Sequence, residues 1–217
     1  MIGVYNYTVV ATYIGFSCAI CGIRFAYCDD IFGAVICLLA AGFCDAFDGK
    51  IARTKKDRND LEKKFGIQID SLSDVVCFGV LPGMIGCSLC RDNRLYGGVM
   101  IFYVLAALIR LAYFNVTEDE RQAQTDEVRK TYLGLPVTAS AVLVPMTFCF
   151  MPLLGSEFET AFGLAMAITG ILFITPMKVP KPGKKLMPVL VAIGCCIAVV
   201  LITEYCLGLL DWEALRG

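Results

Sequence analysis

The sequence predicts an all-α fold, a polytopic membrane bundle of six to eight transmembrane helices. Of the 217 residues, 58% are hydrophobic and 18% are charged, and the mean hydropathy is +0.70. The charged residues gather in short islands between long apolar runs, whereas the helices of a soluble domain each carry a polar face. These runs approach or reach the roughly 20 residues that cross a bilayer as a helix.

Seven apolar segments are candidates for spans, and we interpret six or seven of them as spans of a single domain, residues 1–217. In order, they are residues 6–27, 31–49, 67–90, 95–116, 134–153, 157–175 and 187–210. Six or eight spans would return the C-terminus to the side of the N-terminus, and seven would place it on the other side.

The first three segments each carry a local signal. Residues 6–27 lack the basic stretch, short apolar core and cleavage site of a signal peptide, so we expect this span to be retained. Residues 31–49 end in aspartates and are followed by a charged stretch, residues 53–65, which we expect to be a solvated loop or a helix extension. Within residues 67–90, Gly79 and Gly83 flank Pro82, which indicates close helix packing or a kink.

The later segments are separated by polar connections. Residues 117–132 follow the fourth segment, and the acidic stretch GSEFET joins the fifth to the sixth. The connection TPMKVPKPGKK, residues 175–185, holds three prolines and four lysines. This composition predicts a stiff, basic connection at the membrane surface before the last segment.

Basic residues are concentrated in alternate connections. These 14 of the 19 basic residues are Lys50, Arg53, Lys55, Lys56, Arg58, Lys63, Lys64, Arg121, Arg129, Lys130, Lys178, Lys181, Lys184 and Lys185. Alternate connections face the same side of a membrane, and cytoplasmic connections carry an excess of Lys and Arg. We therefore expect the N-terminus and the loop after the second segment to be cytoplasmic.

The absence of histidine excludes several kinds of active site. A Ser-His-Asp triad, a Cys-His pair and a histidine-ligated metal are ruled out, so proton transfer falls to a carboxylate, Lys, Tyr or Cys. Of the 12 cysteines, two pairs have C-x-x-C spacing, Cys18 with Cys21 and Cys87 with Cys90. Both pairs lie inside apolar segments, so we interpret them as small buried hydrophobic residues rather than metal ligands.

The end of the second segment places carboxylates on one helix face. Asp45, Asp48, Gly49, Ala52 and Arg53 occupy positions i, i+3, i+4, i+7 and i+8. Residues at these positions share a face. The small residues would let a phosphorylated group approach the backbone, and the guanidinium is a bidentate phosphate donor.

A second face follows at the start of the third segment. Gly66, Asp70 and Asp74 are spaced by four residues, and both faces lie at the same end of their helices. Ionised groups at membrane depth cost about 2.5 to 3.5 kcal/mol each, so the converging carboxylates need protons or a cation. Mg2+ combines one or two carboxylates with phosphate oxygens, and four aspartates can hold two such ions.

Eight positions over residues 45–74 resemble the signature of the CDP-alcohol phosphatidyltransferases, polytopic enzymes that join a CDP-linked lipid or alcohol to an acceptor hydroxyl and release CMP. The pattern is Asp45-x2-Asp48-Gly49-x2-Ala52-Arg53, followed by Gly66-x3-Asp70-x3-Asp74. The gap between Arg53 and Gly66 is 12 residues, longer than is usual in the family. We expect this insert to lengthen the cytoplasmic loop without displacing the ligands.

Three further blocks resemble the phosphatidylserine synthase branch of this family. They are residues 70–82, 109–116 and 132–141, so the resemblance covers a catalytic core of about residues 5–145. It implies an integral, multi-pass cell-membrane enzyme with its active site on the cytoplasmic side, with CDP-diacylglycerol and L-serine as substrates, membrane lipid around it, no nucleic-acid partner and a homodimeric state. Tyr113 departs from this branch, which often has Arg there, and Arg110, Arg121 or Lys130 would then supply the charge.

The resemblance also implies roles for the site residues. Asp45, Asp48 and Asp70 would bind one Mg2+ or Mn2+ ion, and Asp74 would join Asp45 and Asp70 at a second. Asp74 is also the candidate general base for the serine hydroxyl. The remaining candidate ligands are Gly49, Ala52, Arg53, Gly66 and Thr12 for the cytidine and phosphate, and Arg110 and Asn115 for the acceptor carboxylate or the lipid phosphate. Helix capping is an equal interpretation of Asn115.

Two alternatives stay open. The same phosphatidyl group could pass to glycerol phosphate or inositol phosphate, anionic acceptors that call for a dense Arg/Lys pocket. A membrane cation transporter is the alternative from another class, because carboxylates within a membrane commonly mark ion pathways. That alternative leaves Gly49, Ala52 and Arg53 without a role.

Overall fold

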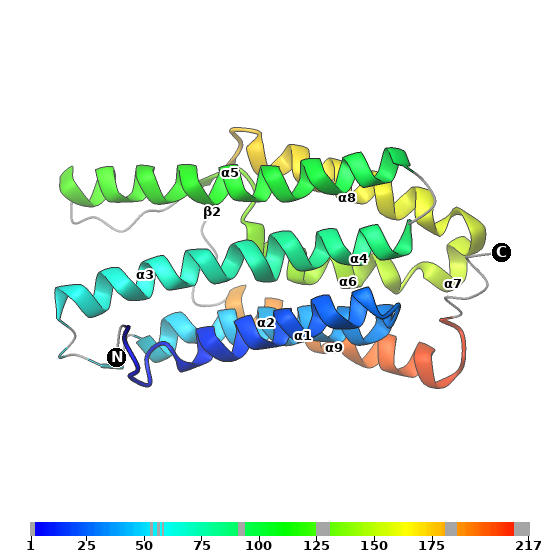
Figure 1. Ribbon diagram of the computed structural model, residues 1–217, viewed down its shortest axis with the longest axis horizontal. Helices are drawn as coiled ribbons and strands as arrows, with labels where there is room; N and C mark the ends of the chain where they lie inside the picture. The colour runs from blue at the N-terminus through cyan, green and yellow to red at the C-terminus, as the bar shows by residue number, and fades with distance from the viewer. Residues whose placement is uncertain are drawn as a thin grey trace.

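The computed structural model is an antiparallel bundle of long helices (Figure 1), which confirms the predicted all-α membrane fold. It describes residues 3–52, 54, 55, 57, 59–90, 94–124, 131–180 and 186–210. The elements are α1 (Val10–Tyr27), α2 (Ile31–Ala52), α3 (Asp60–Asp74), η1 (Val75–Val80), α4 (Leu81–Leu89), α5 (Arg94–Gln124), β1 (Thr131–Leu133), η2 (Val137–Ala139), α6 (Ser140–Phe148), α7 (Met151–Leu154), η3 (Gly155–Glu157), α8 (Phe158–Ile174), β2 (Lys178–Pro180) and α9 (Leu186–Cys206). Among the described residues, six helical stretches are long and apolar enough to cross a membrane.

Helices α1 and α2 form a tight hairpin because small residues face each other. A Cβ atom added at Gly22 would lie 2.9 Å from Cys37 Cβ, and one at Gly15 would lie 3.1 Å from Cys44 Cβ. Ala19 is fully buried in the same interface. This close approach brings the end of α2, with its aspartates, alongside the start of α1.

The third span is one continuous helix in the middle of the bundle, made of α3, η1 and α4 (Figure 1). It begins at Asp60 rather than at the predicted residue 67, because Asn59 and Glu62 form a capping box that starts the helix. Close packing around Pro82 is confirmed, since a Cβ atom at Gly83 would lie 2.6 Å from Val104 Cγ2 of α5. Helix α3, which carries the aspartates, packs against α1, and η1 directly after it packs against α1, α2 and α5.

The predicted fifth span, residues 134–153, is not a single helix. It is divided into η2, α6 and α7, and α6 has only nine residues. Prolines at positions 136, 145 and 152 each remove a backbone donor, and Gly155 turns the chain with a φ of +50°. The prediction of one long span was wrong here because apolar composition hides these breaks.

A short antiparallel ribbon is the one departure from an all-helical fold among the described residues. β1 pairs with β2, with Thr131 opposite Pro180 and Leu133 opposite Lys178. Gly134, which follows β1, has a φ of +77°, and a Cβ atom there would lie 2.6 Å from the Phe173 carbonyl oxygen. The ribbon ties the connection before α6 to the connection after α8.

Different helix ends meet at the two ends of the bundle. Helix α1 begins where α2 ends, where α3 begins and where α5 ends (Figure 1). At the opposite end, Phe32 in the first turn of α2 stacks on Tyr205 in the last turn of α9, with ring centroids 4.1 Å apart. The last turn of α9 therefore lies at the end of the bundle opposite to the end of α2.

The cysteines are free, and the prediction that both C-x-x-C pairs are buried was wrong for three of the four residues. Cys90 is buried, Cys18 is half-buried, and Cys21 and Cys87 are exposed. The exposed thiols lie on helices of apolar composition, so the outer surface of a membrane bundle accommodates them as the core does.

Candidate functional site

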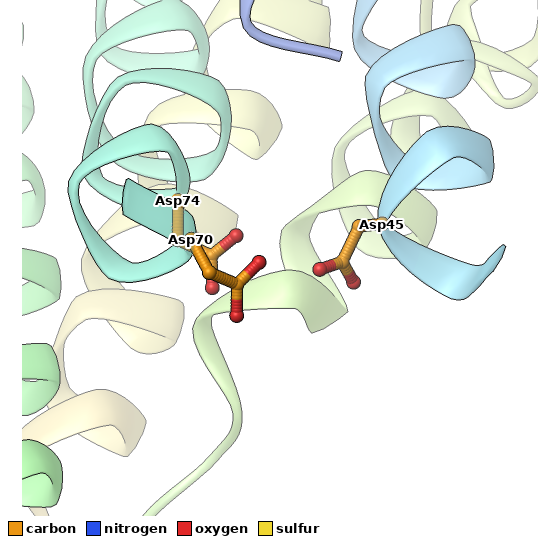
Figure 2. A group of neighbouring side chains, drawn as sticks. All are labelled: Asp45, Asp70 and Asp74. Atoms are coloured by element: carbon orange, nitrogen blue, oxygen red, sulfur yellow. The ribbon is translucent and has the colours of Figure 1, made fainter. Parts of the chain in front are cut away.

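Three of the predicted aspartates converge. Asp45 comes from α2, and Asp70 and Asp74 come from α3, and Figure 2 shows their carboxylates turned toward one another. One carboxylate oxygen of each residue lies within 4.8 Å of the others. The convergence predicted from the helical spacing is therefore observed.

Asp48 lies at the edge of this group. Its side chain is buried, at 9% exposure, and its Oδ2 accepts a hydrogen bond from Thr12 Oγ1 at 3.2 Å. Its carboxylate also interacts electrostatically with that of Asp70. The structure thus adds a link from α1 to the group through Thr12, which the sequence named as a candidate.

A small pocket surrounds the carboxylates, with a volume of about 190 Å³ including its open side. Its walls come from α1, α2, α3 and η1. The lining residues are Ala11, Thr12, Gly15, Ala41, Cys44, Asp45, Asp48, Asp70, Ser73, Asp74, Cys77 and Phe78. Small residues on α1 and α2 leave this space, and the aspartates give it a strongly acidic wall.

The donor set suits a hard divalent cation. Carboxylates this close repel one another when ionised, and either protons or a cation can relieve that repulsion. The group offers several oxygen donors and has no competing histidine or thiolate within the three-carboxylate cluster. Oxygen-rich sites of this kind fit Mg2+ and Mn2+.

The small signature residues lie beside the pocket. Gly49 is exposed, and a Cβ atom added there would have nothing within 4 Å. Ala52 is the last residue of α2, and Gly66 lies on α3 one turn before Asp70. The backbone at Gly49 is thus open to an approaching group, while Arg53 lies outside the described residues.

The two polar candidates on α5 do not line the pocket. Arg110 is 8% exposed, its guanidinium lies 5.0 Å from the Phe114 ring centroid, and it interacts electrostatically with Asp74. Asn115 Oδ1 accepts a hydrogen bond from Ser71 Oγ at 3.1 Å. Helix capping by Asn115 is wrong, because α5 continues to Gln124.

Two described residues, Arg110 and Arg121, could supply the positive charge that an arginine at position 113 would carry. Tyr113 is 57% exposed and points away from the core. Arg121 is engaged with Glu118, at 2.7 Å between Nη2 and Oε1. Arg110 is therefore the described candidate that lies near an aspartate of the pocket, and Lys130 falls outside the described residues.

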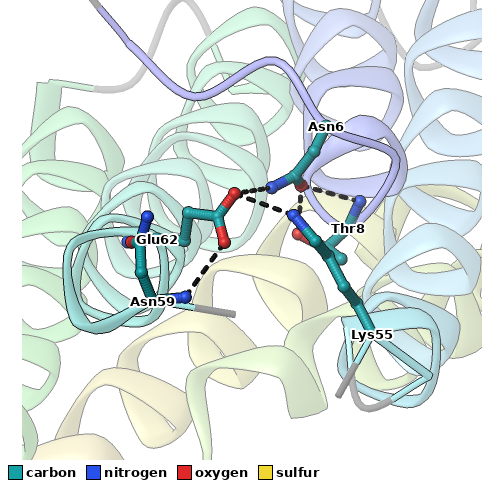
Figure 3. A network of polar contacts seen from close by, with 5 residues as sticks. All are labelled: Asn6, Thr8, Lys55, Asn59 and Glu62. Atoms are coloured by element: carbon teal, nitrogen blue, oxygen red, sulfur yellow. Dashed lines mark hydrogen bonds and ion pairs between the residues drawn. The ribbon is translucent and has the colours of Figure 1, made fainter. Parts of the chain in front are cut away.

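A polar network that the sequence analysis did not identify ties the N-terminal segment to the start of α3 (Figure 3). Glu62 Oε1 accepts from Asn6 Nδ2 at 2.9 Å and from Lys55 Nζ at 2.8 Å. Asn6 in turn accepts from the Thr8 backbone and hydroxyl groups. The capping pattern N-x-x-E, which begins at Asn59, is the signal in the sequence that would have marked Glu62.

Comparison with known proteins gives a consistent result. The sequence profile of the CDP-alcohol phosphatidyltransferase family matches residues 6–175. A protein of Methanocaldococcus jannaschii named CDP-diacylglycerol–serine O-phosphatidyltransferase is 33% identical over 173 residues, which cover 80% of this chain and 76% of the relative. Relatives of the same name from Bacillus subtilis and Helicobacter pylori are 27% and 29% identical, over 82% and 66% of this chain and 90% and 59% of their own length.

Proposed function

Because the chain belongs to the CDP-alcohol phosphatidyltransferase family, we propose that it transfers the phosphatidyl group of CDP-diacylglycerol to the hydroxyl of L-serine, giving phosphatidylserine and CMP. Three relatives whose names state this reaction support the choice of serine. The observation that carries the proposal is the convergence of Asp45, Asp70 and Asp74, because these signature residues from two helices form one acidic group beside a pocket.

The aspartates have the donors for two divalent cations. Asp45, Asp48 and Asp70 would hold one Mg2+ or Mn2+ ion, and Asp74 would join Asp45 and Asp70 at a second. A bound cation would neutralise the pyrophosphate of the lipid substrate and the charge that develops on departing CMP. Thr12 holds Asp48 in place from α1 through its hydrogen bond.

The transfer itself is a displacement at phosphorus. A carboxylate oxygen of Asp74 takes the proton of the serine hydroxyl, and the serine oxygen forms a bond to the phosphorus on the lipid side. The bond from that phosphorus to the bridging oxygen breaks, and CMP leaves with the electron pair. A bound divalent cation next to Asp74 would favour the ionised state of the carboxylate that must accept the proton.

The remaining signature residues orient the substrates. The open backbone at Gly49 allows close approach of the cytidine or phosphate, together with Ala52, Gly66 and Arg53. Arg110 and Asn115 would hold the acceptor carboxylate or the lipid phosphate from α5.

We place this site on the cytoplasmic side of the membrane. The support is the basic residues next to it, which include Lys50 and Lys55 at the end of α2 and after it. A lipid substrate keeps its acyl chains in the bilayer and presents its headgroup at the interface, while serine arrives from water. A homodimer is also proposed on the family resemblance, and light scattering of the protein in detergent tests it.

An acceptor panel tests the proposal. Purified protein in detergent is given CDP-diacylglycerol and Mn2+ or Mg2+ with serine, glycerol phosphate or inositol phosphate, and CMP is measured. We expect CMP with serine alone. If CMP forms only with glycerol phosphate or inositol phosphate, that compound and not serine is the acceptor. If metal ions cross the membrane of proteoliposomes and no CMP forms, the protein is a transporter and not a transferase.

A further inference from the structure

The helix that carries Asp70 and Asp74 widens directly after Asp74. Residues Val75–Val80 form a π-helical turn, in which the Leu81 N–H bonds to the Val76 carbonyl five residues earlier. Such turns are rare, and they often lie at functional sites. Phe78 of this turn also lines the pocket of the aspartates, so the turn and the site are in direct contact.

Pro82 explains why the turn is wide. In a regular α-helix the carbonyl of Phe78 would accept from the N–H of residue 82, but proline has no N–H and its ring crowds the carbonyl four residues before it. The Phe78 carbonyl therefore lacks the donor that a regular α-helix would give it. Water cannot take the place of that donor, because Phe78 is only 1% exposed.

Tyr103 of α5 supplies that donor. Its hydroxyl donates to the Phe78 carbonyl oxygen at 2.8 Å, and the Tyr103 side chain is fully buried. Ser140 Oγ at the start of α6 lies 3.2 Å from the same oxygen and 2.8 Å from the Val137 carbonyl, so its single proton serves two acceptors. Tyr103 is thus the main side-chain donor to Phe78.

The wide turn sets the direction of the aspartates. Each residue of an α-helix turns the chain by about 100°, and the wide turn accommodates one extra residue. Without that residue, Asp70 and Asp74 would be rotated by about 100° around the helix axis relative to α4. Helix α4 is fixed by buried side chains such as Leu81 and Ile85. The turn therefore decides whether the α3 carboxylates meet Asp45.

We propose that Tyr103 is a positioning residue for the acidic site: by donating to the Phe78 carbonyl it holds the wide turn that aims Asp70 and Asp74 at Asp45. The inference rests on the proposed metal-dependent transfer. Tyr103 itself touches neither the pocket nor the aspartates.

Binding of Mn2+ tests this role without substrate or turnover. Electron paramagnetic resonance follows free Mn2+ during titration of purified protein in detergent, for the wild type, Tyr103→Phe and Tyr96→Phe. Tyr96 lies two turns earlier on the same helix and is a matched loss of one hydroxyl. We expect Tyr103→Phe to bind Mn2+ about tenfold more weakly, the lower end of the range for groups that orient metal ligands, and Tyr96→Phe to bind as the wild type does.

Turnover adds a second readout. In the CMP assay, the Mn2+ concentration for half-maximal rate should rise by the same factor in Tyr103→Phe, while KM for serine stays at the wild-type value. A general loss of packing would not separate these constants. If Tyr103→Phe does not fold, Ser140→Ala is titrated in its place and should show a smaller loss of Mn2+ affinity.

The outcomes separate this inference from the proposed function. Unchanged Mn2+ affinity in folded Tyr103→Phe, or in Ser140→Ala when that variant is needed, would overturn the positioning role and leave the transferase intact. A wild type that binds no Mn2+ would overturn both. Weaker binding in Tyr103→Phe alone, with a parallel shift in the Mn2+ dependence of the rate, supports the role.

Discussion

At the scale of single residues, Asp70 of α3 connects the aspartates of α2 with those of α3. Its carboxylate interacts electrostatically with that of Asp48 and belongs to the converging group with Asp45 and Asp74. Crowded carboxylates stabilise a bound cation but weaken the protein without one, so ligand binding and stability oppose each other at this residue.

Replacing Asp70 by Asn should separate these two effects. In the presence of a chelator, Asp70→Asn should be at least as stable as the wild type, because the amide removes one negative charge and can donate to Asp48. Saturating Mn2+ at 100 times its Kd should stabilise the wild type by about 2.7 kcal/mol, and the variant far less. Thermal unfolding in detergent with and without Mn2+ measures both, and an equal Mn2+ gain in the variant would remove Asp70 from the ligands.

A substitution at Gly49 should have the opposite effect, because it should reduce activity and leave the stability of the protein unchanged. Nothing lies within 4 Å of a Cβ atom at this position, so Gly49→Ala should leave folding unchanged or stabilise the helix by about 0.5 to 1 kcal/mol. The added methyl group would displace a substrate that packs on the backbone, and misplacement by about 1 Å can cost about 10²-fold in rate.

The matched control for Gly49 is Gly97→Ala on α5. A Cβ atom there also has nothing within 4 Å, and the position is far along the chain from the aspartates. CMP release and thermal unfolding are measured for both variants. Full activity in Gly49→Ala would mean that no substrate group packs on this backbone.

Helical periodicity explains how much of the site was predictable at this scale. The spacing of the aspartates predicted their shared faces, and the structure brings three of them within 4.8 Å. Contacts between different helices carry no such signal: Ser71 and Asn115 are 44 residues apart, and the interaction of Arg110 with Asp74 also crosses between elements. Such pairs depend on tertiary packing, which local spacing does not specify.

At the scale of elements, prolines decide how apolar runs are divided. Pro82 widens a helix that nevertheless continues from α3 into α4, whereas Pro136 and Pro152 accompany real breaks in the fifth segment. The sequence predicted packing or a kink around Pro82 but not the wide turn, because the outcome depends on Tyr103, a donor from another helix. Segment boundaries were predictable where composition changes and not where capping extends a helix.

The capping box at the start of α3 should matter for stability more than for chemistry. Asn59 accepts from the Glu62 N–H at 2.7 Å, and Asn59→Ala should cost about 1 kcal/mol. For a chain of this size that corresponds to a fall in Tm of about 2 to 4 °C. Asp70 lies about three turns further along the helix, so CMP release per folded molecule should not change.

Asn59→Asp provides the control for the capping prediction, because aspartate is also a good N-cap residue and should restore the Tm. A large loss of activity in folded Asn59→Ala would instead mean that the network of Asn6, Lys55 and Glu62 contributes to the site and not only to the start of α3.

At the scale of the whole molecule, the end of α2 and the start of α3 lie at one end of the bundle, and the last turn of α9 lies at the other (Figure 1). The multi-pass character was predictable from composition, because apolar runs must be buried in lipid or protein. The number of crossings was not, because the short α6 falls below the length of an ordinary span.

Topology reporters should distinguish the two ends. An enzyme that is active only outside the cytoplasm should be inactive when fused after Gln124 at the end of α5, and active when fused after Leu210 beyond α9. The physical reason is the excess of basic residues at the aspartate end. If both fusions were active, or both inactive, the predicted arrangement of the two ends would be contradicted. If only the fusion after Gln124 were active, the acidic site would lie outside the cytoplasm.

Serine-dependent release of CMP from CDP-diacylglycerol, with Mn2+ and then with excess chelator, is the measurement that tests the central claim most directly. Wild type and Asp119→Asn, an exposed aspartate of α5, should form CMP in step with phosphatidylserine, and chelator should stop both. Asp74→Asn should be slower by about 10²- to 10⁴-fold, the contribution of a general base. CMP formation that continues in chelator, or an Asp74→Asn variant as fast as the wild type, would contradict a metal-dependent transfer centre built from the aspartates of α2 and α3.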